Sequence, residues 1–263
     1  MRKVKYLWQM ARYFLKLSYN GTHFNGWQVQ DNTANTVQQV IQEKISLLLK
    51  EEIELVGCGR TDTGVHAKNY MAHFDSQCPD LITNKKFWIS KFNMILPIEI
   101  SIQNITQVDE KAHARFDAIS RTYYYFLHQY KNPFIERFSY YSYGDIDFEL
   151  MNKAALSLLE FQDFTSFSKL HTQSKTNNCK ITKALWQKIG ENEWRFTISA
   201  DRFLRGMVRA IVGTLLLVGR NKMTLDEFKK TIEAKDRSKA GNNVPAHALF
   251  LTRIEYPKDC YCE

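Results

Sequence analysis

The order in which strand-like and helix-like patterns follow one another limits the fold of this chain more than any other feature. Residues 12–19 alternate apolar and polar side chains, which is typical of a strand. Thr36 then predicts a helix N-cap, with Gln39 completing a capping box before apolar residues recur at helical spacing up to Lys50. The following patterns predict strands at 53–58 and 70–74, a helix at 85–94 and a strand at 98–108.

The second half of the chain repeats this order without detectable identity to the first. Its patterns predict strands at 122–127, 180–188, 194–199 and 249–255, with helices at 147–161, 203–218 and 224–233. Each half therefore follows the order β-α-β-β-α-β of a ferredoxin-like unit. We expect an α+β fold in which two such halves, 1–110 and 111–263, pack into one mostly antiparallel sheet with helices on one side and a central basic cleft.

The charge balance favours a polyanionic partner. The chain has 36 Lys+Arg against 28 Asp+Glu, a net charge of +8, which attracts nucleic acid, although a basic solvated surface has the same composition. Five cysteines without a disulfide spacing favour reduced thiols and a cytoplasmic location. No apolar run approaches the length of a membrane span, so no membrane is expected. Cys260 and Cys262 have no matching ligand pair, and a frayed terminus is expected there.

The segment Gly57–Ala67 (GCGRTDTGVHA) is the most informative stretch for chemistry. It follows a predicted strand directly, and its three glycines allow tight turns and close approach of a ligand. Between the glycines stand one cation, Arg60, and one carboxylate, Asp62. The residues alone leave two interpretations open, a functional loop and a glycine turn with a surface ion pair.

Within this segment, GRTDTGVHA resembles the signature of the TruA family of tRNA pseudouridine synthases. Further blocks resemble the same family in the same order, from about residue 12 to residue 257. They are residues 19–30 with TVQ at 36–38, FNMILP at 92–97, HARF at 113–116, RTYYY at 121–125, DFTSF at 163–167 and FLRGMVRAIVG at 203–213.

The resemblance implies an isomerase that converts uridine to pseudouridine at positions 38, 39 and 40 in the anticodon arm of tRNA. The N-glycosidic bond breaks and a carbon–carbon bond forms to the same ribose, so the reaction is redox-neutral and hydrolyses nothing. No metal and no organic cofactor is therefore expected. The resemblance also implies a homodimer with the tRNA lying across both subunits.

The resemblance assigns roles to four residues. Asp62 aligns with the nucleophilic aspartate, whose carboxylate attacks carbon and later leaves. Arg209 aligns with the arginine that pairs with it and favours its charged form. Tyr123 aligns with the tyrosine that packs on the target base, and Arg60 with the arginine that occupies the space left by the everted uridine. Attack on the ribose C1′ and attack on the uracil ring both stay open.

The other polar residues are assigned less specifically. His66, His23, His73 and His113 are expected to be structural, and phosphate contacts are expected among Lys16, Lys68, Lys169, Lys175 and Lys180. The sequence departs from the family at Thr172 and Asn177, where Cys and Pro are usual, and at Ala248, where Gly is usual. Because alanine disfavours positive φ, the last change puts the backbone conformation there in doubt.

Three other functions stay open. The first is a tRNA-binding protein of the same fold without catalysis, against which the presence of Asp62 and Arg209 argues. The second is a paralogue that modifies another RNA site. The third is a metal-dependent hydrolase using Asp62, His66 and His73, for which no further suitably spaced carboxylate is present.

Overall fold

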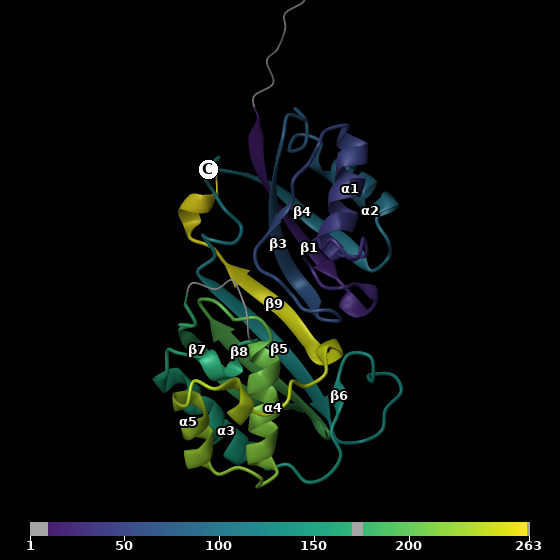
Figure 1. The fold of residues 1–263 in the computed structure, drawn as a ribbon. Helices are drawn as coiled ribbons and strands as arrows, with labels where there is room; N and C mark the ends of the chain where they lie inside the picture. Colours follow the sequence, from purple (N-terminus) through teal and green to yellow (C-terminus); the bar gives the residue numbers. More distant parts are fainter. Residues whose placement is uncertain (1–9, 170–175, 262–263) are drawn as a thin grey trace, which may run out of the picture.

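The computed structural model describes residues 10–169 and 176–261, and one sheet runs through them in the strand order β4-β1-β3-β9-β5-β8-β7 (Figure 1). The strands are β1 (Ala11–Tyr19), β3 (His66–Ser76), β4 (Ile100–Val108), β5 (Ser120–His128), β7 (Ile181–Gly190), β8 (Glu193–Ala200) and β9 (Leu249–Glu255). Two short strands extend it, β2 (Val56–Gly57) beside β3 and β6 (Tyr140–Tyr141) beside β5. Only the β3–β9 and β5–β6 pairs among the described strands are parallel, which confirms the predicted α+β class with a mostly antiparallel sheet.

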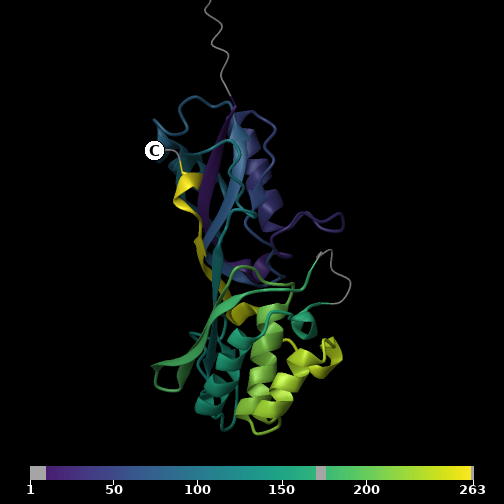
Figure 2. The same cartoon turned by 90° about the vertical axis from the view of Figure 1, so that its left-hand side faces the viewer.

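Helices cover one face of this sheet (Figure 2). Its first part carries α1 (Val37–Leu49) and α2 (Lys85–Ile95), and its second part carries α3 (Phe148–Ser157), α4 (Met207–Gly219) and α5 (Leu225–Glu233). Helix α4 is the most apolar of them, and nearly all of its side chains are buried. It therefore lies at the centre of its half, and its first turn borders the other half.

Two hydrophobic cores lie under these helices. One joins α1 and α2 to β1, β3 and β4, and the other joins α3, α4 and α5 to β5, β7 and β8. Val65, from the first half, is buried in the second core, while Ala112, Ala114 and Leu251, from the second half, are buried in the first. Leu251 pairs with Ala67 where β3 meets β9, and Val65 directly precedes β3, so the halves share a continuous sheet at this point.

Two predicted helix boundaries and one predicted capping box were wrong. The Thr36 side chain caps α1 by accepting from the Gln39 amide, but the Gln39 side chain donates to Glu43, so no capping box forms there. The helix predicted from residue 203 begins at Met207, because Gly206 has φ 75° and its left-handed backbone stops the helix from starting earlier. The helix predicted over 147–161 ends at Ser157 and continues only as a 3-10 turn.

The departures from the family pattern fit the fold where the structure describes them. Ala248 is buried in a 3-10 turn and is absent from the residues with positive φ, so its backbone suits alanine. The Asn177 side chain donates to the Thr165 hydroxyl at 2.9 Å. Thr172 lies outside the described residues. The expectation of a frayed tail was wrong for the described residues up to Tyr261, because Tyr261 forms an antiparallel bridge with Val108. Cys262 lies outside the described residues.

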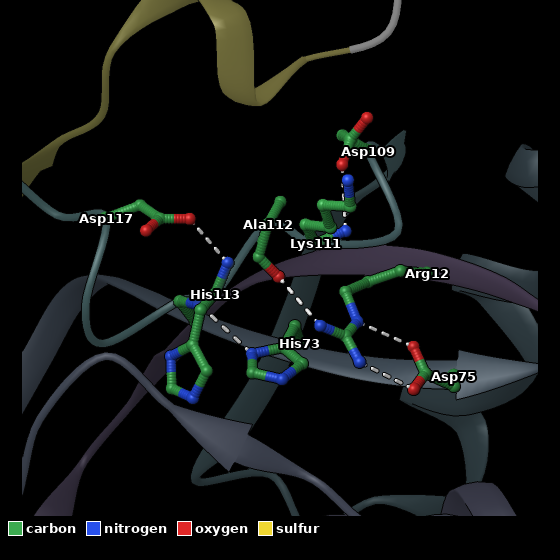
Figure 3. Close-up of polar contacts among 9 residues, drawn as sticks. Arg12, His73, Asp75, Asp109, Lys111, Ala112, His113 and Asp117 are labelled. Carbon is green, nitrogen blue, oxygen red and sulfur yellow. Dashed lines mark hydrogen bonds and ion pairs between the residues drawn. The ribbon is translucent and has the colours of Figure 1, made fainter.

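The connection between the halves is fixed to the first one (Figure 3). Arg12 on β1 makes a bidentate ion pair with Asp75 at 2.7 and 2.8 Å and donates to the Ala112 carbonyl at 3.1 Å. The His73 ring accepts from the Ala114 amide at 3.1 Å, and burial lowers the pKa of that ring to about 4. The neutral ring therefore stays an acceptor at neutral pH, and the segment leading into β5 is held against β1 and β3.

Candidate active site

Asp62 lies on the loop between β2 and β3, and neighbouring segments fix this loop. The Tyr19 and Thr61 hydroxyls share a hydrogen bond of 2.8 Å, and the Thr61 carbonyl accepts from the Trp27 amide at 3.2 Å. The Asp62 carbonyl accepts from the Val65 amide at 3.1 Å, which closes a turn over Gly64, whose φ is 80°. The carboxylate therefore stands on a backbone that is held on both sides.

Gly21 is packed so closely against this loop that a larger residue there should displace it. A Cβ on Gly21 would overlap the Val65 carbonyl oxygen. We expect Gly21→Ala to lower the free energy of unfolding by about 1–3 kcal/mol, because a well-packed interior cannot yield without moving backbone. Urea denaturation measures the change. Gly59→Ala is the matched control, since a Cβ there meets no heavy atom within 4 Å; an equal loss in both variants would contradict the steric explanation.

Two arginines contact the Asp62 carboxylate, one from just before α4 and one from its first turn. Nη1 of Arg209 lies 3.4 Å from Oδ2, and Nε of Arg205 lies 3.6 Å from Oδ1. The Arg209 side chain is 20% exposed, and its Nε donates to the Val244 carbonyl at 2.7 Å. Two side chains 147 positions apart in the sequence thus form the expected carboxylate–guanidinium pair.

Tyr123 on β5 borders both cores beside this pair. Its ring packs edge-on against Phe203 with a centroid distance of 5.1 Å. Burial above all raises the pKa of the Tyr123 hydroxyl, and the nearby charges of Cys58 and Asp62 raise it further. The phenol therefore keeps its proton at neutral pH. Tyr125, two residues on, is fully buried and donates to the Pro245 carbonyl at 3.1 Å, which makes it a core residue.

Arg60 is exposed two residues before Asp62, and among the described residues it has no ion-pair partner. Burial of part of its side chain lowers the pKa of Arg60, and the charges of Arg115 and Arg205 act in the same direction. Arg60 is thus close enough to Arg115, and to the Arg205 that contacts Asp62, for their positive charges to repel it. A rim of such cations attracts an anion.

Sequence reasoning missed the roles of Arg205 and Arg121. The Arg121 guanidinium donates to the backbone carbonyls of Cys58, Arg115, Ala118 and Asp201, and so ties the active-site loop to the connection and to the second half. Arg121 lies in the motif RTYYY, and Arg205 lies in the motif FLRGMVR. No spacing rule points to them, because their partners lie far away in the sequence.

His66 occupies both of its ring nitrogens with backbone groups. Nδ1 accepts from the Gly21 amide at 3.0 Å, so the proton is on Nε2, which donates to the His247 carbonyl at 2.9 Å. The ring therefore has no free lone pair for a metal ion. Within residues 10–169 and 176–261 no group of three or more His, Cys, Asp and Glu is placed to bind one. The described residues thus lack the ligands that a hydrolase using Asp62, His66 and His73 requires.

The buried neutral state of His66 predicts that acid destabilises the fold. Burial lowers the pKa of His66 to about 4, so the unfolded chain takes up a proton below about pH 6.5 while the folded chain does not. Stability is therefore lost as the pH falls from about 6.5 towards 4. Between pH 7 and pH 5 we expect His66 alone to contribute a loss of about 2 kcal/mol. Urea titrations of wild type and His66→Gln at both pH values measure it, and equal losses would contradict this assignment.

The candidate lysines are spread over the molecule. Lys68 lies over the rings of Phe126 and Phe250, 5.7 and 5.4 Å from their centroids. Lys169 donates its backbone amide to the Arg205 carbonyl at 3.0 Å. No described ion pair links Lys16 or Lys180 to the site, and Lys175 lies outside the described residues.

The described residues thus bring together a carboxylate on a fixed loop, two arginines that contact it and a nearby tyrosine that keeps its proton. The chain belongs to the tRNA pseudouridine synthase family, whose model matches residues 17–117 and 154–257. The resemblance seen in the motifs is thereby confirmed. Across the described residues, no helix combines the length and apolar character that crossing a bilayer requires.

Three bacterial relatives called tRNA pseudouridine synthase A match over almost their whole length. The protein of Porphyromonas gingivalis is 50% identical over 96% of this chain and 100% of its own. That of Bacteroides thetaiotaomicron is 51% identical over 97% of this chain and 94% of its own. That of Parabacteroides distasonis is 52% identical over 96% of this chain and 98% of its own. The match therefore covers both halves of the sheet.

Proposed function

We propose that this protein isomerises uridine to pseudouridine at positions 38, 39 and 40 of the tRNA anticodon stem-loop, with Asp62 as the nucleophile. The observation that carries the proposal is the Asp62 carboxylate, fixed by Arg209 at 3.4 Å in a chain of this family. In the net reaction the bond from uracil N1 to ribose C1′ breaks and a bond from C5 to C1′ forms. The C5 proton goes to solvent and N1 takes up a proton, so atoms and electrons balance without a cofactor.

Each neighbour of Asp62 has a part in this proposal. Arg209 orients the carboxylate, since its own Nε is anchored on the Val244 carbonyl. Tyr123 offers a ring face to the everted uracil and a hydroxyl that keeps its proton for a hydrogen bond. Arg60 is exposed on the same loop and fills the gap in the RNA stack. Eversion costs a few kcal/mol of stacking, which contacts between the arginines and the RNA offset.

The proposal extends to the architecture. Residues 1–110 and 111–263 form two ferredoxin-like halves, and the pairing orders β4-β1-β3-β2 and β9-β5-β8-β7 support this because they are equivalent. The basic cleft lies between the halves and takes its charge from Arg60, Arg115, Arg205 and Arg209.

The proposed enzyme is a homodimer in the cytoplasm. The sheet face opposite the helices, which carries Tyr124 and Phe126, supports the dimer. The free thiols at Cys58 and Cys179 suit a reducing compartment.

Tritium release from tRNA transcripts labelled at C5 of uridine tests the activity, and chemical mapping locates the product. We expect label to be released from transcripts with uridine at positions 38, 39 or 40, and none after replacement of these uridines by cytidine. Binding of the tRNA without any release would establish the non-catalytic alternative. Release with product at other positions would establish the paralogue that modifies another RNA site.

A further inference from the structure

The two arginines on Asp62 differ in how firmly they are held. Arg209 is mostly buried and uses a second donor, Nε, on the Val244 carbonyl at 2.7 Å. The Arg205 side chain is 54% exposed, and its one described polar contact is the 3.6 Å approach of Nε to Asp62 Oδ1, which is beyond hydrogen-bond distance. Arg209 is thus a fixed partner of the carboxylate, whereas Arg205 is a loose one.

The backbone that carries Arg205 is nevertheless fixed. The Arg205 carbonyl accepts from the Lys169 amide at 3.0 Å, and Gly206 immediately after it has φ 75° at the entry to α4. Only the side chain is therefore free to reorient. An arginine side chain on a fixed backbone reaches several ångströms around its Cα without disturbing the fold.

The surroundings of Arg205 favour a contact with a phosphate over its present contact with Asp62. Arg60 lies close enough to Arg205 and to Arg115 for their charges to lower its pKa, and neither Arg60 nor Arg115 has an ion-pair partner among the described residues. An exposed ion pair beyond hydrogen-bond distance adds little stability, whereas guanidinium binds a phosphodiester through two parallel hydrogen bonds. A backbone phosphate arriving at this rim should therefore displace the contact with Asp62.

We propose that Arg205 is a further substrate-binding residue, which contacts Asp62 in the free enzyme and moves to an RNA phosphodiester beside the everted uridine in the complex. This inference rests on the proposed function. Its consequence is that Oδ1 of Asp62 loses its cation only when RNA is bound, while Arg209 keeps its hold on Oδ2. In the free enzyme the Arg205 guanidinium thus stays beside the carboxylate until the substrate takes it away.

The test compares kcat and KM for tRNA at about 50–200 mM salt in wild type, Arg205→Gln and Arg205→Lys. A lost phosphate contact should raise KM about tenfold in Arg205→Gln and lower the slope of log KM against log salt by about 0.7–0.9. We expect kcat to change by less than about twofold, because Arg205 has already left Asp62 in the complex. Arg205→Lys should restore the salt slope and part of the affinity, since it keeps the charge but not the bidentate geometry.

Lys222→Gln is the control, because Lys222 is exposed just beyond the other end of α4 and should leave both KM and the slope at their wild-type values. A lower kcat in Arg205→Gln with wild-type KM and salt slope would overturn the inference, since Arg205 would then act only on Asp62. Wild-type values throughout would overturn it too. A wild-type enzyme that releases no label would instead refute the proposed function, so the two failures are distinguishable.

Discussion

Replacing Asp62 with asparagine should lower the rate of pseudouridine formation by at least about 10⁴-fold, the scale of removing a nucleophile. Asparagine keeps the shape of the side chain but has no anionic oxygen with which to attack carbon. Binding of tRNA should change by less than about threefold, because the arginines that attract the RNA remain. Single-turnover tritium release measures the rate, and filter binding measures the affinity.

Asp75→Asn is the matched control for this variant. Asp75 is also an ion-paired aspartate, but it lies on β3 and faces Arg12 and the connection between the halves (Figure 3). The Arg12 guanidinium lowers the pKa of Asp75, so its loss should reduce stability while the folded enzyme turns over at the wild-type rate. Pseudouridine formation by Asp62→Asn at a rate near that of Asp75→Asn would show that another group is the nucleophile.

Hydrophobic periodicity predicts most of this fold because the cores are built from it. Strand β9 has the predicted bounds, Leu249–Glu255, and its first four side chains are buried in succession. The start of α4 was wrong for the same reason: Phe203 and Leu204 pack into the second core from a loop, and their apolar character extends the helical pattern past Gly206. The periodic pattern reports which side chains are buried, but it does not report the left-handed backbone of Gly206 that sets the start of α4.

The active site depends on contacts that no local pattern contains. The pairing of Asp62 with Arg209 was expected only from the family resemblance, because 147 positions separate the two residues. Arg205 and Arg121 stand inside equally specific motifs, but their partners are a distant carboxylate and four backbone carbonyls. Every residue has a backbone carbonyl, so the sequence does not indicate which carbonyls accept the hydrogen bonds of an arginine. Such roles become visible only once the chain is folded.

Replacing Arg209 with glutamine should lower kcat/KM by about 10²–10³-fold, the scale of losing one preorganised charged contact in an active site. Its guanidinium fixes Oδ2 of Asp62 and anchors itself on the Val244 carbonyl at the same time. Without it the carboxylate rotates away from its attacking orientation. The free energy of unfolding should also fall by about 1–3 kcal/mol, because the Val244 carbonyl loses its donor.

Two further variants separate charge from geometry in this prediction. Arg209→Lys keeps a cation but cannot bind Oδ2 of Asp62 and the Val244 carbonyl oxygen at the same time, so it should recover only part of the activity. Arg220→Gln, on the residue directly after α4, loses a single hydrogen bond of 2.8 Å to Ser142 and should keep full activity. Wild-type turnover by folded Arg209→Gln would leave Arg205 as the only cation on Asp62. Since an arginine that orients the nucleophile cannot also leave it for a phosphate, that result would reject the exchange proposed for Arg205 as well.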